Sequence, residues 1–397
     1  MRIRNYQQLA RDYKLDAKKT SAALKEQIDG GDLKLEHVSI RKLAEHLVED
    51  GAEWVRTMDP RFGNGDFVES MDAVNTTHFA NITGQFAYSA IMENFNNPEF
   101  VFSGLIPTVE TQFSGERIPG VTMLGDGTEV VNEGSQYPTL GVTQDYVDTP
   151  PTIKRGGIVP VTKEAIFFDR TNLVAANCAD IGGSLGLNKE KRAIDCVIDE
   201  NTTAHRHKWR AYAAHATYGD ASTTSGHYYD NLSASTPLTD YTSIDTVEQL
   251  LANMTDPNTG EPITVMADTL IVTPQLMQTA RRVINATQIV AAIGGFPTSG
   301  NPIQTTAGNL IGNSPYSANY NILTSRLLAA RLGTDTSWFL GNPKKAFVYM
   351  QNWGITVAQA PTNSHLEFQN DIVMQFKASE RGAYFVRRPQ YMAKATA

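Results

Sequence analysis

The chain has 397 residues, enough for two or three ordinary domains or for one large, elaborated domain. Its formal net charge of -8 argues against a protein that binds nucleic acid over its whole surface, because contacts to a phosphate backbone need basic groups. Charged residues make up only 19% of the chain, a low fraction that indicates extensive contacts between subunits.

The two cysteines, Cys178 and Cys196, are too few for a disulfide scaffold. They lie in a segment with a helical pattern, and a straight helix would hold them about 27 Å apart, too far for a disulfide bond. The first residues carry no apolar run typical of a secretion signal, and no segment approaches the length of a membrane span. We therefore expect reduced thiols in a soluble, cytosolic protein.

Residues 1–110 are interpreted as an N-terminal arm, and the first 62 of them carry 23 charges. Between Ile40 and Met58 apolar residues recur at helical spacing, which predicts an amphipathic helix that packs on another surface. The aromatic residues near the basic N-terminus, Tyr6 and Tyr13, are too few for a platform on which bases could stack. We expect this arm to be solvated or to face a partner.

Residues 111–162 are interpreted as an extended β-hairpin loop. Short apolar runs at 121–124, 129–131, 140–142 and 158–161 predict strands, and Gly125-Asp126-Gly127 is typical of a tight hairpin turn. Between residues 100 and 153 one basic residue, Arg117, stands against seven acidic ones. Those seven are Glu110, Glu116, Asp126, Glu129, Glu133, Asp145 and Asp148. So acidic a hairpin, with so few core residues, is expected to project from the protein.

A long helix is expected from a cap at Thr171 to Glu200, bent or broken at Gly182-Gly183. A second helix follows at 244–254, where Asp245 and Glu248 have the spacing of a capping box.

The remaining segments predict strands beside helices. A strand at 269–273 leads to Pro274, which suits the first position of another helix. Residues 294–321 form a long polar loop that we expect to touch a neighbour. Strands are predicted at 338–340, 346–349, 355–357, 372–376 and 383–386. Strands beside helices predict an α+β fold class.

The segment Gly182-Gly-Ser-Leu-Gly186 matches the G-x-S-x-G pattern of a hydrolase nucleophile elbow. That elbow needs a strand before the serine, whereas the residues before Ser184 have a helical pattern. We interpret the glycines as a helix bend and keep a serine hydrolase using Ser184 as a distant alternative.

Three histidines, His205, His207 and His215, lie close together near Asp199 and Glu200 and could supply metal ligands. Their spacing matches no specific metal site, so a solvated or interface cluster is the preferred interpretation. The phosphate-binding loop and dinucleotide motifs are absent from the sequence. We predict no enzyme activity, no catalytic residue, no cofactor and no metal.

The order of these parts resembles the major capsid proteins of tailed bacteriophages, which have the Hong Kong 97-type fold. Residues 154–164 followed by 171–200 look like that family's returning loop strand running into the spine helix of its peripheral domain. Residues 269–284 are similar to a strand and helix of its axial domain. The segments 338–341, 354–357, 370–382 and 386–389 look like its terminal strands. The resemblance covers roughly residues 100–397 as an order of elements, not as a catalytic signature.

The resemblance implies an α+β Hong Kong 97-type capsid fold with four parts. These are an N-terminal arm (1–110), an extended β-hairpin loop (111–162), a peripheral domain with a long spine helix (163–240 and 345–397) and an axial domain (241–344). It implies a major capsid protein that forms homo-oligomeric pentamers and hexamers and closes an icosahedral shell around packaged double-stranded DNA. The DNA would be enclosed without sequence-specific binding, in a virion capsid assembled in the host cytoplasm, with no membrane partner.

The resemblance leaves portal, scaffold and decoration proteins open as further partners. Because the sequence starts at Met1, we expect the arm to be retained and any scaffold to be a separate protein. An encapsulin-type cellular nanocompartment shell is the alternative within the same fold.

The acidic loop is expected to lie across an adjacent subunit. Residues expected at inter-subunit contacts are Arg117, Asp126, Glu129, Arg155, Arg381, Arg387 and Arg388. Some family members crosslink a loop lysine to a neighbour's asparagine. This chain has no lysine between Lys42 and Lys154, so we expect a non-covalent shell.

Overall fold

The computed structural model describes residues 6–30, 42, 45–46, 73–119, 130–137, 146–162, 164, 173–199, 216–219, 229–256, 260–285, 289–290, 310–311, 320–360 and 372–397. The chain divides into two compact units. The first unit comprises Met1–Phe100, Ile153–Lys189 and Trp353–Gly382, and the second unit comprises Val101–Thr152, Glu190–Asn352 and Ala383–Ala397.

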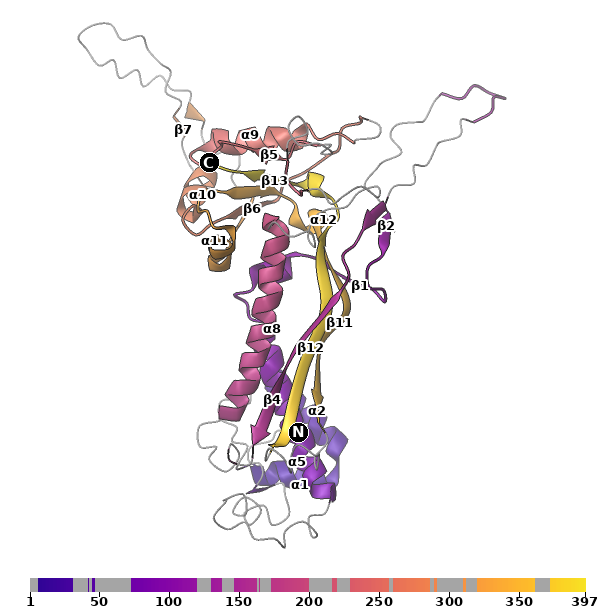
Figure 1. Cartoon of the computed structure of the whole chain (residues 1–397), viewed down its shortest axis with the longest axis vertical. Coiled ribbons are helices and arrows are strands. Elements are labelled where there is room, and N and C mark those ends of the chain that lie inside the picture. Colours follow the sequence, from indigo (N-terminus) through magenta and orange to yellow (C-terminus); the bar gives the residue numbers. More distant parts are fainter. Residues whose placement is uncertain are drawn as a thin grey trace, which may run out of the picture. The chain divides into compact units, whose positions relative to one another are not determined.

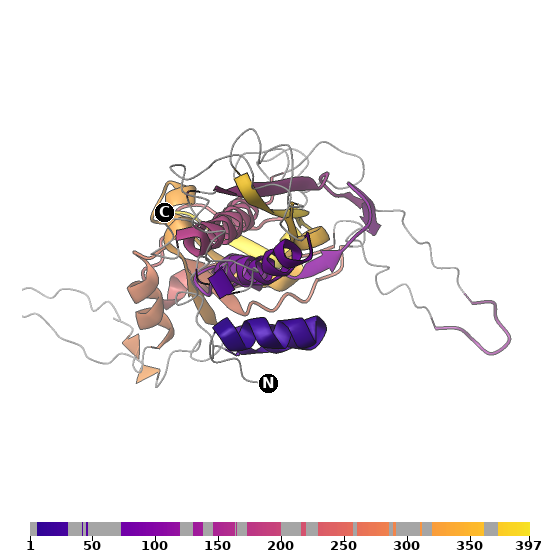
Figure 2. The same cartoon turned by 90° about the horizontal axis from the view of Figure 1, so that it is seen from below.

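The N-terminal helices of the first unit pack on one another. Helix α1 (Tyr6–Leu15) contacts α2 (Ala17–Asp29), and α2 contacts α5 (Ala73–Phe95), as Figures 1 and 2 show. Leu9, Tyr13 and Leu24 are almost fully buried within this single chain. Helices α1 and α2 thus bury these apolar side chains within their own chain, and the expectation of a solvated or partner-facing arm stays a prediction. The predicted helix at 40–58 lies almost wholly outside the described residues.

The long helix α8 (Leu173–Ile198) continues through Gly182 and Gly183 without a break. A Cβ atom at Gly182 would collide with the carbonyl oxygen of Ile91 on α5. At Gly186 a Cβ would lie 2.7 Å from the carbonyl oxygen of Phe95. These two glycines let the backbones of α5 and α8 approach closely, which a larger residue would prevent. The expected helix was bent or broken at these glycines: a break is wrong, a bend stays a prediction, and the expected cap Thr171 lies outside the described residues.

The first unit also contains a ladder of long strands (Figure 1). Strand β4 (Ile153–Thr162) pairs antiparallel with β12 (Ile372–Val386), which neighbours β11 (Phe347–Gln359) in the sheet order. In β4, Val159 and Val161 are buried, whereas Ile158, which precedes Val159, is exposed. Gly157, on the same face as these valines, lies against Ile181 of α8, so the ladder packs one face on α8 and leaves the other open.

The predicted terminal strands are present but joined. The runs at 346–349 and 355–357 belong to the single strand β11, and those at 372–376 and 383–386 to β12. Of the strands predicted in the loop, only 158–161 is observed, within β4. Val130 and Val131 are not in a strand, and the runs at 121–124 and 140–142 lie outside the described residues.

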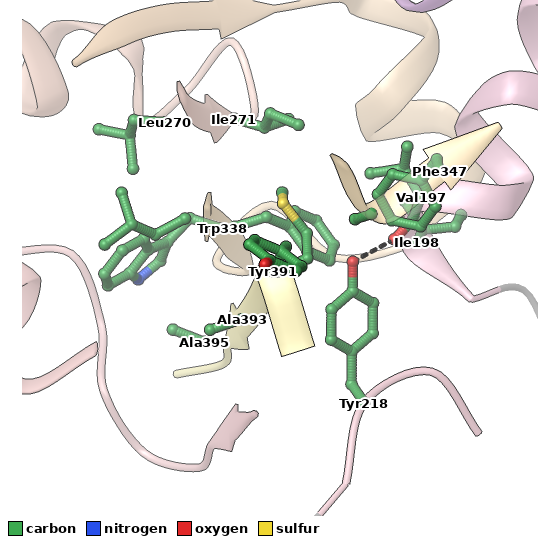
Figure 3. Close-up of a cluster of buried hydrophobic side chains, with 14 of the residues drawn as sticks. Val197, Ile198, Tyr218, Leu270, Ile271, Trp338, Phe347, Tyr391, Ala393 and Ala395 are labelled. Atoms are coloured by element: carbon green, nitrogen blue, oxygen red, sulfur yellow. Dashed lines mark hydrogen bonds between the residues drawn. The ribbon is translucent and has the colours of Figure 1, made fainter. Parts of the chain in front are cut away.

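The second unit is built on a five-stranded sheet of order β5-β13-β10-β6-β9. Its strands are β5 (Leu232–Ser233), β13 (Met392–Ala395), β10 (Trp338–Gly341), β6 (Thr269–Val272) and β9 (Asn321–Thr324). Every residue of β6 and β10 is buried. Figure 3 shows this core, in which Trp338 lies among aliphatic side chains and the Tyr218 hydroxyl donates to the carbonyl of Val197 at 2.7 Å.

Helices α9 (Tyr241–Ala252), α10 (Met277–Ile284) and α11 (Arg326–Leu332) belong to the same unit. Asp240 caps α9 by accepting from the Thr242 amide at 3.0 Å, so the predicted capping box of Asp245 and Glu248 is wrong. Helix α10 begins at Met277, after Pro274, so Pro274 does not take its first position.

Shorter elements complete the second unit: α12 (Pro343–Ala346), the 3-10 turn η2 (Pro389–Tyr391), β7 (Ile289–Val290) and β8 (Leu310–Ile311). Helices and sheets in both units confirm the predicted α+β class. In the described part of the chain, no helix combines the length and apolarity needed to cross a membrane.

Candidate inter-subunit contact surfaces

The acidic loop leaves the second unit through a short two-stranded stem, defined here as residues 111–119 and 146–152. Strand β2 (Arg117–Pro119) pairs antiparallel with β3 (Tyr146–Asp148). The guanidinium Nε of Arg117 lies 3.3 Å from the carboxylate of Asp148 across this pair. Arg117, predicted as an inter-subunit contact, thus has an ionic partner in its own chain.

Several bonds fasten this stem to the second unit. The side-chain amide of Asn352 on β11 donates to the carbonyls of Thr111 and Phe113, both at 3.0 Å. Ile118 packs on a small apolar cluster formed by Val348, Met350 and Phe385. The base of the loop is therefore held by both polar and apolar contacts.

The segment that leads into the stem is held by a buried carboxylate. Glu190 of α8 accepts from the backbone amides of Phe102 at 2.8 Å and Ser103 at 2.7 Å. These amides open helix α6 (Val101–Leu105), which precedes β1 (Thr108–Glu110). A carboxylate that satisfies two otherwise unpaired amides fixes the start of this helix. Strand β1 then pairs in parallel with β11, so the chain enters the stem from a fixed position.

Two of the predicted arginines lie on the ladder of β4 and β12. Arg155 is the register partner of Glu380, which is buried, and Arg381 is the register partner of Lys154. The Arg381 guanidinium carbon lies 5.5 Å from the ring centre of Trp353, and the Lys154 ammonium lies 6.0 Å from it. These cations share one aromatic ring, an arrangement that favours a positive charge over the ring face.

The other two predicted arginines, Arg387 and Arg388, follow the end of β12. Their backbone amides donate to the carbonyl of Ala346 at 2.8 and 3.1 Å. This contact brings them close to the exposed Lys344 and Lys345 of α12, which were not among the predicted contact residues. The one sequence signal for these lysines was the Pro-Lys-Lys run before a predicted strand.

The other predicted contact, catalytic and metal-binding residues find no support in the described part of the chain. Asp126 and Glu129 lie outside the described residues, as do His205, His207 and His215. Ser184 lies inside α8, with helix on both sides, so the nucleophile-elbow interpretation is wrong. In the described residues, no three His, Cys, Asp or Glu side chains are placed to hold a metal ion.

Both cysteines are free and buried in α8. Burial raises the pKa of the Cys178 thiol to about 11. Burial also raises the pKa of Cys196, and the nearby carboxylates of Asp199 and Asp195 raise it further. Both thiols are therefore protonated at neutral pH, a state in which they are poor nucleophiles and poor metal ligands.

The described residues thus combine a stem fastened at its base, basic side chains on and near β12, and a mixed α+β core. The family model of phage capsid proteins matches residues 146–395. The chain belongs to this family, so it is a capsid protein, as its resemblance to the Hong Kong 97-type capsid proteins of tailed bacteriophages predicted.

A search of curated proteins finds no match. Among solved structures, the chain is similar to a capsid protein of cyanophage P-SCSP1u, with 12% identity, a TM-score of 0.44 and coverage of 74% of this chain and 85% of that chain. It is similar to a protein of Mycobacterium phage Bobi, with 14% identity, a TM-score of 0.43 and coverage of 74% and 89%. It is also similar to a virus-like particle protein from Pyrococcus furiosus, with 11% identity, a TM-score of 0.40 and coverage of 78% and 98%.

Proposed function

We propose that this protein is the major capsid protein of a tailed bacteriophage and that its copies close an icosahedral shell of pentamers and hexamers around packaged double-stranded DNA. Its role is structural and involves no catalysis. The shell forms in the host cytoplasm and becomes the virion capsid. Within it, residues 1–110 are the arm, 111–162 the extended loop, 163–240 and 345–397 the peripheral domain, and 241–344 the axial domain.

One observation supports the proposal beyond family membership: in the described part of the loop, residues 130–137, two large apolar side chains are left in solvent. Val130 is 96% exposed and Tyr137 is 80% exposed. Apolar side chains so exposed on a projecting segment are typical of a surface that another molecule covers. In a shell of identical copies, the covering molecule is the next subunit.

The charge of the chain suits a container for DNA. The net charge of -8 limits adhesion of the shell protein to the polyanion that it encloses. We propose that the acidic loop, including Asp126 and Glu129, meets cations of an adjacent copy, among them Arg381, Arg387 and Arg388. Arg117 and Arg155 belong to the same proposed contact region, although Arg117 is ion-paired within its own chain.

Electron microscopy of the purified protein tests the proposal directly. The expected result is closed shells of uniform size, with DNA in particles isolated from infected cells. Unassembled subunits under all conditions, or particles that hold enzyme cargo and no DNA, would overturn it. The second outcome would indicate a cellular nanocompartment.

The loop contact has its own test. Changing Asp126→Lys together with Glu129→Lys should lower the yield of closed shells, because the loop would then present cations to cations. A matched control is Glu93→Lys on the exposed side of α5, which should leave the yield unchanged. The shells should also dissociate into single chains on denaturing gels, since the loop offers no lysine for a crosslink.

A further inference from the structure

Helix α10 has one face in the core of the second unit and one face that its own chain leaves open. The buried side chains of this helix are Ala280, Val283 and Ile284. The exposed side chains on α10 and at its C-cap are Gln278, Arg281, Arg282 and Asn285. These four positions have the spacing of a single helix face, and each side chain carries N–H donors. The open face of α10 therefore offers donors and two positive charges, with no carboxylate among them.

The two arginines of this face have no ionic partner in the described part of the chain. No described carboxylate pairs with Arg281 or Arg282, and the Arg282 guanidinium makes only a long contact, 3.5 Å, to the Thr279 hydroxyl. Asp335 accepts from Gln275 at 2.6 Å, but Gln275 precedes the helix, whereas both arginines lie in its last turn. Cations in a last turn interact favourably with the helix dipole, which lysine would do equally well. Their charges thus remain available to an anion from outside the subunit.

The open face of α10 suits the phosphate backbone of DNA. Arginine, asparagine and glutamine side chains are among the groups that contact phosphate oxygens in protein–DNA complexes. From residue 278 to residue 285 the helix rises about 10 Å, so its donors can follow a strand and not only a single small ion. Two exposed cations bind phosphates weakly, but every copy in a shell repeats the same face. A long polyanion would therefore meet many such contacts at once.

An acidic helix of another copy is a poorer partner for this face. Asp240, Asp245 and Glu248 lie at the cap and on the helix of α9. Asp240 already accepts from the amide and the hydroxyl of Thr242, at 3.0 and 2.6 Å. Asp245 accepts from the side-chain amide of Gln249 at 2.9 Å. Docking α10 on α9 of a second copy would compete with these bonds, whereas contact with DNA phosphates would not.

We propose that the exposed face of α10, centred on Arg281 and Arg282, contacts the phosphate backbone of the packaged double-stranded DNA. This inference rests on the proposed function and names a surface by which the shell meets its DNA, so it places α10 on the inner side of the shell. The contact reads no base sequence, because phosphates carry no sequence information. It is compatible with the net charge of -8, since a local basic strip attracts DNA while the rest of the chain repels it.

Photo-crosslinking in DNA-filled particles tests this contact. A photoreactive residue in place of Gln278 lies beside both arginines and should form covalent adducts with DNA. The same residue in place of the exposed Thr246 on α9 is the control and should give far fewer DNA adducts. Equal amounts of DNA adduct from the two positions would overturn the proposal. Crosslinks from position 278 to another protein chain instead of DNA would also overturn it.

Charge variants in the same particles test whether the arginines make the contact. Arg281→Gln with Arg282→Gln should lower the DNA adducts from position 278 about tenfold, because both phosphate contacts lose their charge. Arg281→Lys with Arg282→Lys keeps both charges and should retain the adducts to within about twofold. Lys344→Gln with Lys345→Gln removes two exposed charges from α12 and is the matched control, which should leave the adducts unchanged. Wild-type adducts from the glutamine pair would contradict the proposal.

Shell yield separates a contact with DNA from a contact between subunits. Both arginine double variants should close shells at the wild-type yield, because the proposed contact does not join copies. Loss of shells in the glutamine pair, with a normal melting temperature of the unassembled subunit, would make α10 an interface between copies and overturn the proposal. If the wild-type protein forms no shells, or shells without DNA, the proposed function itself fails. That result is distinct from DNA-filled particles that give no adducts at position 278.

Discussion

Strands β10 and β4 differ in how much of their surface their own chain covers. All four residues of β10 are buried, whereas outward residues of β4, such as Ile158, alternate with buried ones such as Val159. Strand β10 has strand neighbours on both sides, β13 and β6, while β4 is last in its sheet order. A strand that its own chain fully covers contributes to folding, and one left half open can also contribute to assembly.

The exposed edge of β4 is protected against simple strand addition. Pro160 lacks an amide hydrogen, and Lys154 and Arg155 place cations along the strand. Proline and lysine on an edge strand discourage pairing with another strand. A neighbouring copy is therefore expected to bind the open face of β4 and not to extend the sheet.

The largest effect on the free energy of unfolding is expected in the buried core of the second unit. The wholly buried side-chain amide of Asn231 lies within bonding distance of the carbonyls of Thr217, Pro389 and Met392, at 2.8 to 3.2 Å. Its carbonyl oxygen accepts from the Gly219 amide at 2.9 Å. Asn231→Ala leaves several buried polar groups unpaired and should lower the free energy of unfolding by about 4 kcal/mol.

Denaturant unfolding of the unassembled subunit measures this change. Asn285→Ala, at an exposed position after α10, is the control and should change stability by less than about 0.5 kcal/mol. Similar losses of stability in both variants would mean that the buried hydrogen bonds of Asn231 do not stabilise the core.

Much of the fold could be predicted because its signals are local. The apolar spacing of the long helix and the apolar runs of the final strands predicted α8, β11 and β12, although one continuous strand can span two runs. The first residue of α9 was predicted wrongly because Asp240 also fits a cap, and only the backbone geometry distinguishes it from Asp245. Gly182 was interpreted as a bend or break because the reason for this glycine, the nearby backbone of Ile91, is distant in sequence.

The contact surfaces could be predicted less well, because they depend on register. Charge counts alone indicated an acidic loop and arginines near the C-terminus. The opposition of Lys154 and Arg381 depends on how β4 aligns with β12, which no local pattern reveals. Similarly, the pairing of Arg117 with Asp148 depends on the register of the stem.

The second prediction concerns the closed contact between α5 and α8 in the first unit. Gly182→Ala places a methyl group against the Ile91 carbonyl and should cost about 3 kcal/mol, because two helix backbones must separate. Gly183→Ala is a control with no atom within 4 Å of the added Cβ. It should stabilise the helix by about 0.5 to 1 kcal/mol. In thermal or denaturant unfolding, Gly182→Ala should lower the free energy of unfolding and Gly183→Ala should raise it. Destabilisation by Gly183→Ala would contradict the open space beside Gly183.

The third prediction concerns the segment that leads to the loop. Glu190→Gln keeps the shape of the side chain but replaces one acceptor oxygen with a donor facing a backbone amide. One of the Phe102 and Ser103 amides then loses its partner, so the free energy of unfolding should fall by about 2 kcal/mol. Glu93→Gln on the exposed side of α5 is the control and should be neutral. Equal stability of Glu190→Gln and wild type would show that the carboxylate does not hold α6.

The smallest expected effect tests the comparison within a single strand. Val159 and Ile158 are adjacent in β4 and face opposite sides of the sheet. Val159→Thr buries a hydroxyl and should cost about 1.5 kcal/mol in the unassembled subunit, whereas Ile158→Thr should cost less than about 0.5 kcal/mol. Shell yield should respond in the other sense, with a clear loss for Ile158→Thr despite its normal stability. Both variants introduce the same side chain, so a large difference in their response reports mainly on the face that each residue occupies. Equal costs in the unassembled subunit would mean that the chain itself covers Ile158, and the open face would then be unavailable to a second copy.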